Sequence, residues 1–268
     1  MSNLLHRNTN RCQLIKDVSK QFWEDIISFH STGQNSSEIY YTKKLVSTIL
    51  GHATSLNYSI FAKEPGMEKR WGSDIDIYIE RGVNDFLLYA FQAKLLKTGQ
   101  EYSDLDRNKN GIYQYQKLVN YGVYKQCYVY YLFYNGVLNY THSGNNKCNT
   151  AFDEDQFGLS YVEIDDIQTV IPHKINWTFN HFHPNLASPL SQLVCCKNSR
   201  RNNIKSYDYE EIIKELEDYE IINQENVEAF FGKAIDLNSQ QTTDQIDKIE
   251  SERKSDVVIV IRNTKSTY

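Results

Sequence analysis

The chain has 268 residues, of which 40% are hydrophobic and 24% charged, a composition typical of a globular protein with one main domain. Its mean hydropathy is −0.58, and no apolar run approaches the roughly 20 residues that cross a bilayer, which excludes a membrane protein. A net charge of −5 argues against a strongly basic nucleic-acid-binding protein, although the local distribution of charge decides what a surface binds.

The cysteines and the N-terminal stretch bear on location. The five cysteines are an odd number spread along the sequence, and they do not indicate a disulfide framework in a chain of this length. The first residues are polar and lack the apolar segment of a signal peptide. We therefore expect a reducing, cytoplasmic location.

Two helices are predicted at the start of the chain. Residues 17–29 place four apolar side chains on one helix face: Val18, Phe22, Ile26 and Phe29. A second helix is expected to begin near Ser36 or Ser37, either of which can cap it, and to end at Gly51. Glu38 lies in its first turn.

Four strands are predicted next, at residues 58–62, 74–80, 86–94 and 127–134, and a helix is predicted at 111–122. The order is therefore helix, three strands, helix, strand. This order is typical of an α/β domain in which the fourth strand returns parallel to its neighbour.

The C-terminal part has a different pattern. Residues 207–235 are acidic and indicate helices, whereas residues 257–261 have the character of a strand. We therefore divide the chain into a main domain, residues 1–205, and a mainly helical C-terminal region, residues 206–268, which ends in a short strand.

Polar residues share one face of two neighbouring predicted strands. In the second strand, Asp74 and Asp76 alternate with isoleucines, so both carboxylates lie opposite the apolar face. In the third strand, Gln92 and Lys94 are two residues apart and also share a face. A short turn separates the strands, and a hairpin would bring the two polar faces together.

This arrangement suits phosphodiester hydrolysis, which needs an oxygen-lined cation site, a positioned water and a charge that stabilises the transition state. Asp74 would bind Mg²⁺ or Mn²⁺ directly, and the carbonyl oxygen of Gln92 would be a neutral ligand. Asp76 is a candidate for a further metal ligand. Lys94 would orient the attacking water or help to deprotonate it.

The same residues resemble a known group of enzymes. The segment GSDID, followed by QAK, resembles the PD-(D/E)xK nuclease superfamily, in the branch where glutamine replaces an acidic residue, as in Mrr-like restriction endonucleases. By this resemblance, Asp74 corresponds to the family aspartate, and Gln92 and Lys94 to the two later motif positions. Glu38 corresponds to the helical glutamate before the core and completes the implied catalytic set.

The resemblance covers residues 36–136 and implies a restriction-endonuclease-like mixed β-sheet flanked by helices. Residues 114–121 are similar to the glutamine-bearing helix that follows the motif in several of these families. Residues 189–196 resemble a late segment of uncharacterised bacterial members, some of which lie among phage-defence genes.

The function that the resemblance implies is a metal-dependent DNA endonuclease that acts in anti-phage defence, together with partner proteins of a defence system. We also expect a homodimer, because two cuts on a duplex need two sites. Contacts with nucleic acid are assigned to Gln114, Lys117, Arg200 and Arg201.

Several roles have alternatives. Gln92 replaces the commoner glutamate of the family, which removes one negative charge and leaves cation affinity more dependent on Asp76 and Glu38. Asp76 could instead support the site without binding the cation, and Glu38 could serve only to stabilise the N-terminus of its helix. Gln114 could pack as a satisfied polar residue.

Other functions stay open as well. The chain could be a catalytically inactive nuclease-fold module that binds nucleic acid or protein, or a nuclease that acts on RNA or branched DNA. A zinc site is disfavoured because the spacing is unusual for the four residues that could form it: His181, His183, Cys195 and Cys196.

Overall fold

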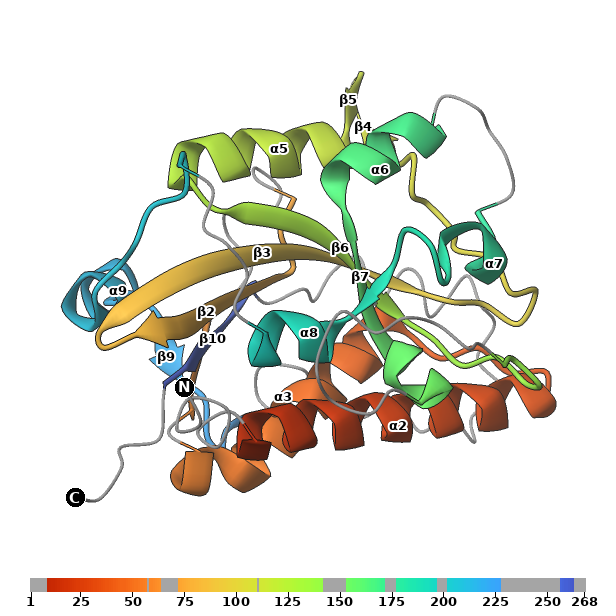
Figure 1. Ribbon diagram of the computed structural model, residues 1–268, viewed down its shortest axis with the longest axis horizontal. Coiled ribbons are helices and arrows are strands. Elements are labelled where there is room, and N and C mark those ends of the chain that lie inside the picture. The colour runs from red at the N-terminus through yellow and green to blue at the C-terminus, as the bar shows by residue number, and fades with distance from the viewer. Residues whose placement is uncertain are drawn as a thin grey trace.

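The protein is a mixed α/β structure, in which one large β-sheet is covered by helices on both faces (Figure 1). The computed structural model describes residues 9–56, 58–63, 72–109, 111–141, 153–171, 177–196, 202–227 and 256–262. The predicted α/β class, with a mixed sheet flanked by helices, is confirmed.

The main sheet has the strand order β8-β7-β6-β3-β2-β10-β1-β9. Its strands are β1 (Tyr58–Lys63), β2 (Ile75–Gly82), β3 (Asp85–Leu95), β6 (Tyr128–Tyr134), β7 (Leu159–Glu163), β8 (Ser188–Pro189), β9 (Glu220–Ile221) and β10 (Asp256–Ile261). A separate two-stranded sheet consists of β4 (Asn108–Lys109) and β5 (Ile112–Tyr113).

The helices form two layers. One face of the sheet packs against α2 (Thr9–Ser31), α3 (Glu38–Leu56) and α8 (Leu190–Cys195). The other face packs against α5 (Gln114–Lys125), α6 (Ile164–Val170), α7 (Phe179–Phe182) and α9 (Tyr209–Glu215), and a 3-10 helix, η1 (Glu154–Gly158), precedes β7. In Figure 1, α2 and α3 lie below the sheet, and α5 and α6 lie above it.

The predicted hairpin is present. Strands β2 and β3 are antiparallel, with Ile75 opposite Phe91 and Ile77 opposite Tyr89. The isoleucines of β2 face α2 and α3, while Tyr78 faces the α5 layer. Because side chains alternate along a strand, Asp74 and Asp76 lie on the α5 side, as the sequence pattern predicts.

The connection from β3 through α5 to β6 is the predicted parallel return. β3 and β6 pair in parallel, with Gln92 beside Tyr131 and Lys94 beside Phe133. From its second residue to its last, β3 is buried, as expected for a central strand covered on both faces. This unit places the end of β3 beneath the first turn of α5.

The helix bounds differ from the prediction. The first helix begins at Thr9, well before residue 17, because buried Cys12 and Ile15 extend its apolar face toward the N-terminus. Ser37 caps α3 as predicted, with its Oγ accepting a hydrogen bond from the N–H of Tyr40 at 3.0 Å. Gly51 does not end α3, which continues to Leu56.

The C-terminal strand lies inside the main sheet and does not end a separate appendage. β10 pairs in parallel with β2 and antiparallel with β1, and β9 pairs with β1. The residues 257–261 are apolar on both faces, so both faces need cover, which a central position provides. The predicted division at residue 205 therefore does not separate the described C-terminal residues from the sheet.

The helical prediction for residues 207–235 holds only for its first part. α9 begins with a capping box, in which Asp208 Oδ1 accepts from the N–H of Glu211 at 2.8 Å, and it ends at Glu215. A connection of four residues, 216–219, then leads to the strand β9 at Glu220–Ile221. Residues 228–235 lie outside the described residues.

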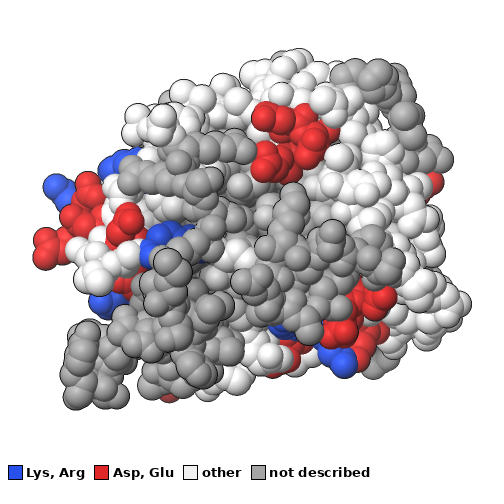
Figure 2. All heavy atoms as spheres, viewed as in Figure 1, with Lys and Arg blue, Asp and Glu red and all other residues white. Residues whose placement is uncertain are grey.

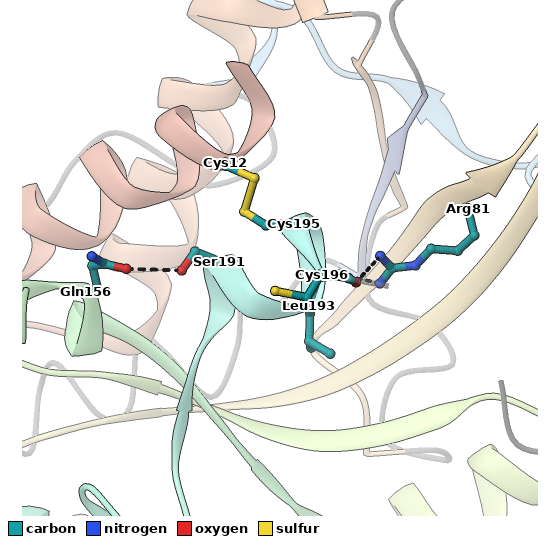
Figure 3. The surroundings of a disulfide bond; sticks show 7 residues. All are labelled: Cys12, Arg81, Gln156, Ser191, Leu193, Cys195 and Cys196. Atoms are coloured by element: carbon teal, nitrogen blue, oxygen red, sulfur yellow. Dashed lines mark hydrogen bonds between the residues drawn. A yellow bond between two sulfur atoms is a disulfide. The ribbon is translucent and has the colours of Figure 1, made fainter. Parts of the chain in front are cut away.

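A disulfide joins α2 to α8, contrary to the expectation from the cysteine pattern (Figure 3). Cys12 and Cys195 are 183 residues apart in sequence, with their Cα atoms 5.3 Å apart. The packing of α8 on α2 brings them together, which the sequence spacing does not reveal. Because disulfides are typical of oxidising compartments, the cysteines no longer support a reducing cytoplasm.

Arg81 completes the surroundings of this disulfide. Its guanidinium donates hydrogen bonds to the backbone carbonyls of Leu193 and Cys196, at the C-terminal end of α8 (Figure 3).

No helix in the described part of the chain is long and apolar enough to cross a membrane.

Candidate functional site

Asp74 lies in the loop that enters β2, and three hydrogen bonds fix it to β3. Its N–H donates to the carbonyl of Phe91 at 2.8 Å. Its Oδ2 accepts from the N–H of Ala93 at 2.9 Å and from Nε2 of Gln92. The carboxylate is therefore held in one orientation on the α5 side of the sheet.

Hydrogen bonds through Gln92 and Gln114 link Asp74 to Lys94. Nε2 of Gln114 donates to Oε1 of Gln92 at 2.5 Å, and Nζ of Lys94 donates to Oε1 of Gln114 at 3.4 Å. We call Asp74, Gln92, Gln114 and Lys94 the site network. It joins an acid, two amides and an amine from three elements, so the predicted trio of Asp74, Gln92 and Lys94 lies in one cluster.

Lys94 is a buried cation with little compensation. Its side chain is 3% exposed, and in the described part of the chain it makes one hydrogen bond, to Gln114, and no ion pair. Burying an ammonium group is costly unless an anion accompanies it. The network therefore has the charge and the free donors to receive an anionic ligand.

Gly72 lets the loop before Asp74 approach α5 closely. Its φ is +76°, and a Cβ at this position would lie 3.0 Å from the carbonyl oxygen of Gln114 and 3.2 Å from Cβ of Lys117. A side chain would therefore push on the first turn of α5. The glycine therefore lets the loop before Asp74 lie against the first turn of α5.

Asp76 lies on the predicted face but is held by protein hydroxyls. Its carboxylate accepts hydrogen bonds from Ser73 Oγ at 2.7 Å and from the hydroxyl of Tyr121 at 2.5 Å. Burial raises the pKa of Asp76, and these two hydrogen bonds oppose the rise. The geometry favours a supporting role in the loop of Asp74 over the predicted role as a metal ligand.

Glu38 is the first residue of α3, and its helix is anchored to β6. Thr42 Oγ1 donates to the carbonyl of Glu38 at 3.0 Å and lies 2.9 Å from the hydroxyl of Tyr134. Burial raises the pKa of Tyr134, and the charges of Asp74 and Glu38 raise it further. The charges of Glu38 and Asp74 therefore act on the same tyrosine.

The predicted nucleic-acid contacts have different positions. Gln114 belongs to the site network, and Lys117 lies one turn further along α5, beside Gly72. Arg200 and Arg201 lie outside the described residues. Gln114 therefore links other site residues, which fits the alternative of a satisfied polar residue.

Several other basic side chains are paired with acids. Lys125 lies 2.8 Å from Glu215, and Lys205 lies 3.5 Å from Glu211. On the face of Figure 2, acidic side chains gather over α6, and charges of both signs lie over α9. Among the described residues of this face, these clusters do not form a basic surface for DNA.

The disfavoured zinc site is not formed. Cys195 is in the disulfide, and Nε2 of the buried His183 lies 2.8 Å from Ser160 Oγ. Burial lowers the pKa of His183 to about 3. Among the described residues, no three His, Cys, Asp or Glu side chains are placed to hold one metal ion.

Tyr131 is a residue that the sequence reasoning missed. It is fully buried in β6, and its hydroxyl has no hydrogen-bond partner among the described residues. Burial raises the pKa of Tyr131, and the charges of Asp74 and Glu38 raise it further. Its place in a tyrosine-rich strand suggested only a core role. The signal that could have pointed to it was the predicted parallel return of the fourth strand to its neighbour, and the structure pairs Tyr131 with Gln92.

The fold and the site define a mixed α/β protein with a partly buried polar site between the β2–β3 hairpin and the first turn of α5. A family model matches residues 11–267 of the chain, and its description is "Family of unknown function (DUF6615)". The chain belongs to this family. Searches of curated proteins and of solved structures found no match.

Proposed function

We propose that the protein is a metal-dependent nuclease that hydrolyses phosphodiester bonds in DNA. The observation that carries this proposal is the site network, in which hydrogen bonds through Gln114 and Gln92 link a buried amine to a fixed carboxylate, and in which the amine has no acidic partner in the described structure. A phosphate group would supply the missing negative charge, and a nuclease needs such a site for its substrate.

The donor atoms are suited to a hard divalent cation such as Mg²⁺ or Mn²⁺. Asp74 offers a carboxylate and Gln92 an amide oxygen, with Glu38 near the same tyrosines. Mg²⁺ keeps several waters and is commonly bound by one or two carboxylates plus substrate phosphates, so a cluster of three acidic residues is not required. When bound, the cation would polarise the phosphate and lower the pKa of a water.

The chain's own residues then have distinct roles. Lys94 neutralises charge that develops on the phosphate and orients the attacking water. Gln114 holds the amine of Lys94 toward the site, and the N–H of Ala93 fixes the carboxylate of Asp74. These groups are set before the substrate arrives, which lowers the cost of ordering the transition state.

The test is cleavage of supercoiled plasmid DNA by purified protein with Mg²⁺ or Mn²⁺, and with chelator. We compare wild type with Asp74→Asn and with Asp165→Asn, which makes the same charge change at an exposed position of α6. Wild type and Asp165→Asn should cut, whereas Asp74→Asn should lose about 100-fold or more in rate. Equal cleavage by all three proteins would identify a contaminating nuclease.

One observation favours a second function, a catalytically inactive module that binds nucleic acid or protein. The carbonyl oxygen of Gln92 accepts a hydrogen bond from Gln114, so it does not point toward Asp74, and the side chain carries no charge. Such a module would bind DNA without cutting it under either metal. The cleavage test also uses RNA and branched DNA, because the same residues would serve a nuclease that acts on either of them.

The biological setting that we propose does not depend on the geometry of the site. The role in anti-phage defence, with partner proteins of a defence system, depends on the sequence resemblance alone. A homodimer would supply two sites for the two strands of a duplex. Sedimentation of the protein with and without DNA tests the dimer.

A further inference from the structure

Tyr131 extends the site network from β3 onto β6. In the parallel pair, Tyr131 is the register partner of Gln92, and its side chain belongs to the cluster on the α5 side of the sheet. Neighbouring strands lie about 5 Å apart, so side chains at paired positions on one face are adjacent. The ring of Tyr131 therefore lies beside the amide of Gln92.

The hydroxyl of Tyr131 is an unused polar group at this place. The residue is 0% exposed, and within the described ranges the hydroxyl finds no donor or acceptor. Buried hydroxyl groups are normally hydrogen-bonded, because burial removes their hydrogen bonds to water and leaving them unpaired costs free energy. An unpaired hydroxyl beside a polar cluster indicates that a ligand completes it.

The charges around the hydroxyl indicate what that ligand is. The negative charges of Asp74 and Glu38 both act on Tyr131 and raise its pKa beyond the effect of burial. Two carboxylates attract a cation, and a hard cation that keeps its waters presents O–H donors in all directions. A neutral phenol oxygen can accept from such a water without adding charge.

We propose that Tyr131 is a further binding residue of the site, and that its hydroxyl binds a water of the hydrated divalent cation held by Asp74. This inference rests on the proposed function, because it assumes that the cation is the one used in cleavage. It also explains how a site with few acidic ligands holds its cation, since groups that bind the cation's waters add to its affinity.

The test compares Tyr131→Phe with Tyr41→Phe by calorimetric titration with Mn²⁺ and Mg²⁺ in the absence of DNA. Tyr41 is a matched control, because its hydroxyl is also buried with no partner among the described residues, but the charge that acts on it is that of Asp25. Removing one hydrogen bond to the cation's shell should raise the Kd about three- to ten-fold in Tyr131→Phe only. The thermal midpoint without cation should not fall in either variant.

Each outcome is decisive. A wild-type Kd in Tyr131→Phe overturns this inference while the proposed nuclease stands. A lower thermal midpoint of Tyr131→Phe without cation also overturns it, since the hydroxyl would then have a structural partner. If wild type binds no cation, or if Asp74→Asn binds it equally well, both this inference and the metal-dependent function fail.

Discussion

Two polar clusters lie on the same side of the sheet, and they differ in how completely their atoms are paired. The first is the site network of Asp74, Gln92, Gln114 and Lys94. The second, which we call the Asn135 cluster, consists of Tyr102, Asn135, Ser160 and His183. Gln92 and Lys94 are as deeply buried as the Asn135 cluster, whereas Asp74 and Gln114 are half-buried. The burial of single residues therefore does not distinguish a functional cluster from a structural one.

The Asn135 cluster is closed. Asn135 Nδ2 donates to the carbonyl of Phe157 at 2.8 Å and to Ser160 Oγ at 2.9 Å, and its Oδ1 accepts from the hydroxyl of Tyr102 at 2.5 Å. Both ring nitrogens of His183 have partners. Such a cluster stabilises the fold. Among the described residues, the site network instead contains a buried amine without an ion pair, next to a tyrosine hydroxyl without a hydrogen-bond partner, as the proposed ligand site requires.

The largest expected effect is on cleavage, at Lys94. Lys94→Met keeps the length of the side chain and removes its charge, so the cleavage rate should fall about 100-fold or more, measured on plasmid DNA. The free energy of unfolding should stay level or rise by about 1 kcal/mol, because a buried charge is replaced by an apolar group. This combination of lost activity and kept stability is expected only of an open cluster.

Lys125→Met is the control for this variant. Lys125 is paired with Glu215 near the surface, so its loss should leave cleavage close to that of wild type. A large loss of stability in Lys94→Met would show that the amine has a structural partner, and the contrast between the clusters would fail at its central residue.

The next effect is on stability, in the Asn135 cluster. Asn135→Ala removes the partner of three groups, Tyr102, Phe157 and Ser160, and should lower the free energy of unfolding by about 3 kcal/mol. Cleavage at a temperature where the variant stays folded should be unchanged. Urea unfolding beside Asn120→Ala, at an exposed position of α5, measures the difference; equal curves would refute the structural role.

The sequence predicted the part of the site that depends on local pattern. Alternation along β2 and β3 places Asp74, Asp76, Gln92 and Lys94 on one face, and the register of a tight hairpin brings them together. The order of elements gave the parallel return to β6. These features need only the period of a strand and the length of a connection.

Other parts depend on packing between distant segments. Which side chain of α5 reaches Lys94 depends on how that helix lies on the sheet, so Gln114 was assigned to DNA and not to the network. The pairing of Cys12 with Cys195 and the entry of β10 between β1 and β2 join segments far apart in the chain. No local pattern encodes the choice of partner in these cases.

A smaller effect on both properties is expected at Gly72. Gly72→Ala places a side chain at positive φ and against the backbone of Gln114, which should cost about 2 kcal/mol of stability and displace the first turn of α5. Gly111→Ala is a matched control, because its φ is +79° but a Cβ there meets nothing within 4 Å. Only Gly72→Ala should also slow cleavage; equal cleavage rates would show that α5 does not position the network.

The smallest effect is the pH dependence caused by Asp76. Burial raises the folded-state pKa of Asp76 above its unfolded value, so the folded protein binds a proton that the unfolded chain has lost. Wild type should therefore lose stability relative to Asp76→Asn as the pH rises from about 4 through the folded-state pKa, and the difference should then stay constant. Paired urea titrations of the two proteins across this range measure it, and effects of other carboxylates cancel in the comparison. If wild type instead gains stability relative to Asp76→Asn as the pH rises, the carboxylate of Asp76 is stabilised in its charged form. A metal ligand or the partner of a cation would behave in this way. Asp76 would then belong with Asp74 in the open cluster.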